Sequence, residues 1–131
     1  MNGEPFFMPR ASGDYLHHRS LIEYGGRDGI RDENAYESAI NHPINVYSYS
    51  QGDMFDMAAA YAFHIAENQP FIEGNKRTGI AMALAFLQAN GLETSVLKDD
   101  ELYDAMIGIA EKRVDKAGLA AIFRQCIRLA P

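Results

Sequence analysis

Residues 69–77, Gln-Pro-Phe-Ile-Glu-Gly-Asn-Lys-Arg, place small and charged side chains where a loop opens a helix. Gly74 permits the positive φ that a backbone nest for an anion requires. A helix that begins near Asn75 leaves the N–H groups of its first turn without intrahelical partners, at the positive end of its dipole. Lys76 and Arg77 add two cations beside those groups. The spacing therefore predicts a phosphate-binding site.

Glu73, just before the glycine, adds a carboxylate to this predicted site. Mg²⁺ is commonly held between a carboxylate and the phosphate oxygens of a substrate, so Glu73 is predicted to hold Mg²⁺. The alternative is that Asn75 is only an N-cap and that Lys76 and Arg77 form a solvated first turn. Cations at a helix N-terminus oppose the dipole, and locally unfavourable choices of this kind are typical of functional sites. We therefore prefer the phosphate site.

The elements around this loop are predicted to be helical almost throughout. Apolar residues recur at helical spacing between capping residues and glycine or proline stops. The predicted helices cover residues 14–24, 33–41 (ended by Pro43), 53–68 (capped by Asp53), 75–90, a stretch from Asp99 or Asp100, and a stretch capped by Asp115. The fourth is apolar on all faces, which predicts the buried centre of the domain.

Two segments depart from that pattern. Residues 43–52 alternate β-forming and polar residues and predict a short extended flap or hairpin. Residues 1–13 predict a surface extension that Phe6, Phe7 and Met8 anchor. The expected fold class is all-α, a bundle of about six helices around a buried central helix, with residues 1–131 as a single domain.

Composition limits the class of protein. The chain has 131 residues, of which 47% are apolar, and its 18 acidic and 12 basic residues give a net charge of −6. This acidic balance argues against a general nucleic-acid binder. Cys126 is the single cysteine and has no partner for an internal disulfide. Because there is no apolar run of about 18 residues and no secretion-signal pattern, we expect a cytoplasmic protein with no membrane partner.

Residues Pro70–Arg77 resemble the active-site signature of the Fic/Doc family, which reads His-Pro-Phe, a variable residue, Asp or Glu, Gly or Ala, and then Asn-Lys-Arg or Asn-Gly-Arg. The Asn-Lys-Arg version is similar to the Doc (death-on-curing) branch. Residues 24–26, 29–32 and 83–91 also resemble this branch, and the likeness spans about residues 15–129. It implies the Fic/Doc helical fold.

The resemblance also implies an activity. Fic/Doc proteins bind ATP with Mg²⁺ at this loop, and most transfer AMP to a protein hydroxyl, whereas the Doc branch transfers the terminal phosphate. The family's metal ligand falls on Glu73, its anion hole on Gly74, Asn75 and Lys76, and its phosphate clamp on Arg77. Lys76 stands where the AMP-transferring branch has glycine, which favours phosphate transfer to a Ser or Thr hydroxyl.

Two further implications concern the partners of the chain. The flap that aligns the target peptide by strand pairing falls on Ile44, Asn45, Val46 and Tyr47. The partners implied are a host protein substrate and a small Phd-type antitoxin that folds as a helix against the toxin.

One position departs from the family pattern, because Gln69 replaces the histidine that acts as general base. A carboxamide accepts no proton near pH 7, and loss of a base removes about 10²–10⁴-fold in rate. Gln69 is therefore expected to orient the acceptor hydroxyl, and phosphoryl transfer, which depends largely on positioning, tolerates the loss best. The predicted catalytic residues are Gln69, Asn75, Lys76 and Arg77. Transfer of AMP and a non-catalytic protein that binds nucleotide or antitoxin remain the alternatives.

The histidines offer no obvious replacement for the missing base. His64 precedes position 69 by five residues, which places it on another face of the helix. His17, His18 and His42 are expected at the surface.

Overall fold

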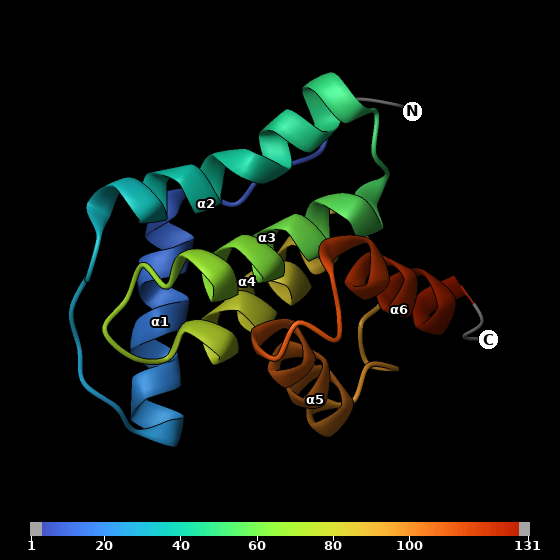
Figure 1. The fold of residues 1–131 in the computed structure, drawn as a ribbon. Coiled ribbons are helices and arrows are strands. Elements are labelled where there is room, and N and C mark those ends of the chain that lie inside the picture. Colours follow the sequence, from blue (N-terminus) through green and yellow to red (C-terminus); the bar gives the residue numbers. More distant parts are fainter. Residues whose placement is uncertain (1–3, 129–131) are drawn as a thin grey trace.

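The structure, a computed structural model, describes residues 4–128, and this part of the chain is helical with no β-strand (Figure 1). Its elements are α1 (Arg10–Tyr24), α2 (Glu33–Asn45), the π-helical turn η1 (Val46–Ser50), α3 (Met54–Asn68), α4 (Asn75–Ala89), α5 (Asp99–Ala110) and α6 (Lys116–Arg128). The all-α prediction is confirmed. No helix in the described range has both the length and the apolar character that crossing a membrane requires.

Helix α3 is the centre of the bundle. It packs against α2, α4, α5 and α6, and Figure 1 shows it passing through the middle of the molecule. Its N-terminus is fixed as predicted, because the Asp53 side chain accepts the N–H groups of Phe55 and Asp56 in a capping box. Four buried alanines leave room for close neighbours: Ala58, Ala59, Ala60 and Ala62.

The prediction that the fourth helix is the buried centre is wrong. One side of α4 is fully buried, but Ile80, Ala81, Leu84 and Ala85 are only half-buried. Helix α4 packs against α1, α3 and α5, and these three helices leave part of its apolar circumference at the surface.

Helices α3 and α4 approach closely through a glycine. A Cβ atom at Gly79 would lie 2.9 Å from the main-chain oxygen of Ala62 on α3. This close approach sets the separation of the two helices that the loop of residues 69–74 joins.

The extended flap predicted over residues 43–52 is also wrong. Helix α2 continues through Pro43, whose ring is buried, and the chain then forms η1 before Gln51 ends the turn with a φ of 56°. The alternating pattern is overridden by tertiary packing, because Val46 and Tyr47 are partly buried against the hydrophobic core. Tyr47 packs edge-on against Phe7 at 5.9 Å between ring centroids.

Residues 6–8 hold the start of the chain on the bundle, as predicted. The main chain of Phe6 exchanges hydrogen bonds with the side-chain amide of Asn90, and the Met8 N–H donates to the Tyr61 hydroxyl at 2.8 Å. The Phe7 ring stacks on Phe86 at 6.0 Å. Burial raises the pKa of Tyr61 to about 12, so this hydroxyl stays neutral across the physiological pH range.

Candidate functional site

The loop between α3 and α4 is bounded by two residues in the left-handed conformation. Gln69 ends α3 with a φ of 48°, and Gly74 precedes α4 with a φ of 86°. Glycine adopts this conformation without steric cost, whereas a glutamine there is uncommon and strained. No side chain caps the N-terminus of α4. The first N–H groups of α4 therefore face the loop and are available to an anion.

Buried aromatic contacts fix the inner side of this loop. Phe71 stacks on His17 with ring centroids 3.8 Å apart and meets Tyr36 edge-on at 4.8 Å. The Asn75 side chain closes the loop, since its Oδ1 accepts the Phe71 N–H and its Nδ2 donates to the Phe71 carbonyl, each at 3.0 Å. Asn75 thus shapes the site through its side chain while its N–H belongs to the exposed first turn of α4.

Residues 29–32 fix the outer side of the loop. The Arg31 N–H donates to the Pro70 carbonyl at 2.6 Å, and the Ile72 N–H donates to the Gly29 carbonyl at 3.0 Å. The Arg31 guanidinium also donates to the carbonyls of Asn68 and Gln69, both at 2.6 Å. Figure 1 shows this segment and the loop at the same end of the bundle. The loop is therefore held from both sides before any ligand binds.

Glu73 presents its carboxylate at the edge of the loop, with a side chain that is 43% exposed. Its Oε1 accepts the main-chain N–H of Arg27, and its carbonyl accepts Nε2–H of His17 at 2.8 Å. His17 is buried, so the expectation that it lies at the surface is wrong; its polar nitrogen is satisfied by this hydrogen bond.

The carboxylate of Glu73 is the predicted metal ligand of this loop. Among the described residues, no group of three or more His, Cys, Asp or Glu side chains is placed to hold a metal ion. Mg²⁺ is usually bound by one or two carboxylates together with substrate phosphates. Glu73 therefore fits a Mg²⁺ ion that also has phosphate ligands.

Arg77 lies between two aromatic rings. Its guanidinium carbon is 3.8 Å from the ring centroid of Tyr24 on α1 and 4.1 Å from that of Tyr103 on α5. Stacking of this kind occupies the two faces of the guanidinium and leaves the N–H groups at its edge free to point at an anion. The two tyrosines thus position the group predicted to clamp a phosphate.

All six predicted loop residues line one open pocket of about 650 Å³: Gln69, Glu73, Gly74, Asn75, Lys76 and Arg77. This volume lies in the usual range for small-molecule sites. Three other residues that line the same pocket were not predicted from the sequence: Glu67, Tyr103 and Lys112. Of these three, only Glu67 had a signal in the sequence, because it lies two residues before Gln69. Tyr103 and Lys112 come from α5 and the segment after it, where no local pattern marks them.

The predicted flap residues lie elsewhere. Ile44, Asn45, Val46 and Tyr47 belong to the end of α2 and to η1, and none of them lines this pocket. The strand-pairing geometry expected of them is absent from the described structure, so their role in binding a target stays a prediction.

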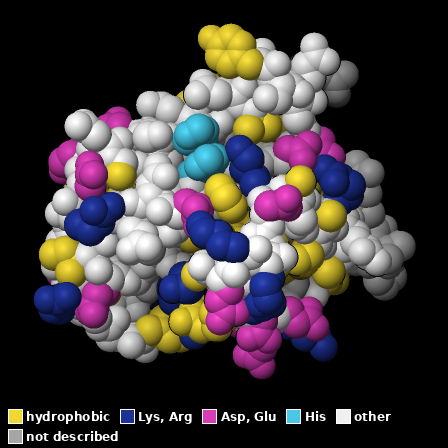
Figure 2. Space-filling view, in the orientation of Figure 1, with side chains coloured by type: hydrophobic (Ala, Val, Ile, Leu, Met, Phe, Trp, Pro, Cys, Tyr) yellow, Lys and Arg dark blue, Asp and Glu magenta, His cyan; other side chains and the backbone are white. Residues whose placement is uncertain are grey.

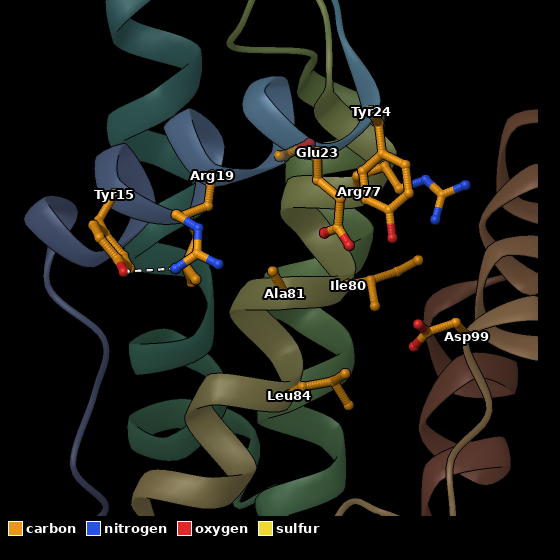
Figure 3. A pocket seen from close by; sticks show the side chains of 11 residues that line it. Tyr15, Arg19, Glu23, Tyr24, Arg77, Ile80, Ala81, Leu84 and Asp99 are labelled. Atoms are coloured by element: carbon orange, nitrogen blue, oxygen red, sulfur yellow. Dashed lines mark hydrogen bonds between the residues drawn. The ribbon is translucent and has the colours of Figure 1, made fainter.

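A second, apolar pocket of about 320 Å³ adjoins the first, between α1 and α4 (Figure 3). Leu16, Ile80, Ala81 and Leu84 contribute to its lining, and the charged residues Arg19, Glu23 and Asp99 also line it. Tyr24 and Arg77 line both pockets. The half-buried flank of α4 thus leads directly to Arg77, the predicted phosphate clamp.

His42 and His64 form a cluster away from both pockets. Their rings stack at 3.6 Å, and Lys116 Nζ donates to His64 Nε2 at 3.1 Å. Burial and the neighbouring His42 and Lys116 lower the pKa of His64 to about 3. His64 is therefore neutral at physiological pH, and it lines neither pocket. On the face shown in Figure 2, histidines gather beside a basic side chain, and acidic and basic groups are interspersed around them.

The chain is similar to known proteins over most of its length. The family model described as "Fic/DOC family" matches residues 14–87, more than half of the chain. "Protein kinase doc" of Escherichia phage P1 is 31% identical over 111 residues, which cover 84% of this chain and 86% of that protein. "Toxin Doc" of Mycolicibacterium smegmatis (strain ATCC 700084 / mc(2)155) is 33% identical over 103 residues, which cover 76% of this chain and 79% of that protein.

Proposed function

The chain belongs to the Fic/Doc family, and from that premise we propose that it is a Doc-like toxin that transfers the terminal phosphate of ATP to a Ser or Thr hydroxyl of a host protein. The observation that carries the proposal is the convergence of Gln69, Glu73 and the Gly74–Arg77 turn on one pocket. The two curated relatives, named as a protein kinase and a toxin, support the same class of activity. We place this activity in the cytoplasm, where ATP is available.

The nucleotide phosphates would bind at the start of α4. The N–H groups of its first turn, Lys76 and the edge of the stacked Arg77 supply hydrogen bonds and positive charge. Glu73 would hold Mg²⁺ against the phosphates, and the bound ion would neutralise charge there. Preorganised donors of this kind stabilise the charge that develops on the transferred group.

Lys76 favours phosphate transfer over AMP transfer. A long cationic side chain narrows the part of the pocket in which the AMP-transferring branch has glycine, and this changes which phosphate fits. Gln69 is exposed at the end of α3 and lines the pocket, so its carboxamide can hydrogen-bond the acceptor hydroxyl. The absence of a histidine at position 69 equally supports a second candidate, a non-catalytic protein that binds nucleotide or antitoxin.

We also propose a Phd-type antitoxin as partner, because both curated relatives carry the Doc name and one is named a toxin. The pocket between α1 and α4 is the surface that fits it (Figure 3). An apolar floor bordered by charged residues is the usual site for an amphipathic helix.

The test of the proposed function uses ATP labelled on either the α or the γ phosphate. The purified chain is incubated with Mg²⁺, each label in turn, and a bacterial cell extract, beside a Glu73→Gln variant and a Glu111→Gln control. We expect protein label from γ only, lost in Glu73→Gln and kept in the control. Label from α would indicate AMP transfer and contradict the argument from Lys76. No label, in a preparation that binds ATP, would favour the non-catalytic alternative.

A further inference from the structure

The proposed transfer needs a group that accepts the proton of the acceptor hydroxyl. The carboxamide of Gln69 does not accept a proton near neutral pH. Among the described residues that line the pocket there is no histidine. The lining side chains with any acid–base chemistry are two carboxylates, Glu67 and Glu73, together with tyrosine phenols and basic groups. Phenols and ammonium groups ordinarily keep their protons at neutral pH, which leaves the carboxylates.

Glu73 is already engaged. Its Oε1 accepts the Arg27 N–H, the Arg27 Nε lies 3.8 Å away, and its position in the signature is that of the metal ligand. A carboxylate that coordinates Mg²⁺ is committed to the metal ion during the transfer, so Glu73 is not free to face the acceptor hydroxyl. Glu67 is therefore the remaining candidate.

Glu67 lies in the last turn of α3, two residues before Gln69. Lys112 Nζ donates to both of its carboxylate oxygens, at 3.0 and 3.2 Å, and the side chain is 30% exposed. Lys112 reaches it from the end of α5 with a φ of 64°, an uncommon conformation for lysine. The ion pair keeps the carboxylate in one place, in the pocket that Gln69 also lines.

We propose that Glu67 is the proton acceptor of the transfer reaction and that Lys112 is its positioning residue; this rests on the proposed function. A bond forms between the acceptor oxygen and the γ phosphorus of ATP, and the bond from that phosphorus to the bridging oxygen breaks. ADP leaves, and the hydroxyl proton passes to the Glu67 carboxylate. A carboxylate has the same role in protein kinases, where an aspartate accepts the substrate hydroxyl proton.

The experiment compares initial rates of γ-phosphate labelling in bacterial cell extract for wild type, Glu67→Gln, Glu67→Asp, Gln69→His and the double variant Glu67→Gln/Gln69→His. Glu111→Gln is the matched control, because Glu111 precedes Lys112 but does not line the pocket. Thermal unfolding and ATP affinity are measured for each protein, so that a folding or binding defect is separated from a chemical one.

We expect Glu67→Gln to lower the rate by about 10²-fold or more with unchanged ATP affinity, and Glu67→Asp to retain part of the rate. The double variant should recover activity, because imidazole at position 69 then accepts the proton. Its acidic limb should lie at higher pH than that of wild type, since imidazoles titrate about two pH units above carboxyl groups. A merely structural role for Glu67 would produce neither the recovery nor the shift.

Three results would overturn the inference. If Glu67→Gln labels protein within twofold of wild type, Glu67 is not the acceptor, although the proposed function stands. If Glu67→Gln is inactive and the histidine restores nothing, the Glu67–Lys112 pair is structural. If wild type transfers no label at all while it binds ATP, the proposed function fails and the inference fails with it.

Discussion

The stacked position of Arg77 leads to a prediction that separates protein stability from ligand affinity. In Arg77→Lys the positive charge stays, but the planar guanidinium that lies between Tyr24 and Tyr103 is lost. Lysine also offers no second, parallel N–H to a phosphate oxygen. The substitution therefore removes two different contributions, and each has its own measurement.

The magnitudes follow from the contacts. Each cation–π contact at an exposed site contributes about 0.5–1 kcal/mol, and a lysine ammonium packs between two rings less well than a planar guanidinium, so the substitution should cost at most about 1–2 kcal/mol of unfolding free energy. One lost hydrogen bond between charged groups costs about 1.5–3 kcal/mol. In ATP affinity this loss corresponds to an increase in Kd of about 10–150-fold.

The assay is isothermal titration of Mg²⁺ and ATP into wild type and Arg77→Lys, with urea unfolding of both proteins. Arg113→Lys is the control, because Arg113 is paired with Glu111 at 2.7 Å and does not line the pocket. The control should bind ATP like wild type. An Arg77→Lys variant that binds ATP within twofold of wild type would refute the assignment of Arg77 as the phosphate clamp.

Three other predictions concern the framework. Gly79→Ala should lower the free energy of unfolding in urea by about 1–3 kcal/mol, because the new Cβ meets the Ala62 carbonyl at 2.9 Å; equal or higher stability would show that the helices can separate freely. His64→Gln should flatten the acid dependence of stability. The pKa of His64 is about 3 in the folded chain against 6.5 ordinarily, so the unfolded chain binds more protons and wild-type stability falls as pH drops from about 6.5 towards 3; an unchanged slope would contradict this. Thr78→Val should raise the unfolding free energy by about 1 kcal/mol, because the buried Thr78 hydroxyl has no hydrogen-bond partner in the described structure; a lower thermal midpoint would be the contrary result.

Local signals in the sequence were sufficient to predict most of the helices. Asp53 caps α3 as predicted, and Asp115 caps α6 by accepting the Gly118 N–H at 2.7 Å. The start of α4 at Asn75 and its left-handed Gly74 also agree with the prediction. These features depend on residues adjacent in the chain, which is why periodicity and capping rules detect them.

Structural features that depend on contacts between residues far apart in the sequence were not predicted. The apolar character of α4 is plain in the sequence, but which of its sides the other helices cover is decided only by their packing. The β-like pattern of residues 43–52 is overridden because Val46 and Tyr47 pack on the hydrophobic core and Tyr47 contacts Phe7. His17 is buried because a carbonyl from another element satisfies its nitrogen.

The site shows the same division. The six predicted residues are close together in the sequence, and they line one pocket. Their expected roles came from the family resemblance. The groups that hold those residues in place come from elsewhere in the chain, including Tyr103 beside Arg77 and Arg31 on the loop carbonyls. No spacing near residue 69 indicates either of them.

The attachment of the loop to residues 29–32 has a consequence for how affinity can change. A protein whose binding shape is populated only in part has an apparent dissociation constant equal to the intrinsic one divided by the competent fraction. The bonds from Arg31 and Gly29 to the loop keep that fraction high. Weakening them would leave every phosphate contact intact, and yet the apparent dissociation constant would rise as the competent fraction falls. Residues 29–32 therefore influence the apparent affinity of the site for its ligand, although none of them lines the pocket.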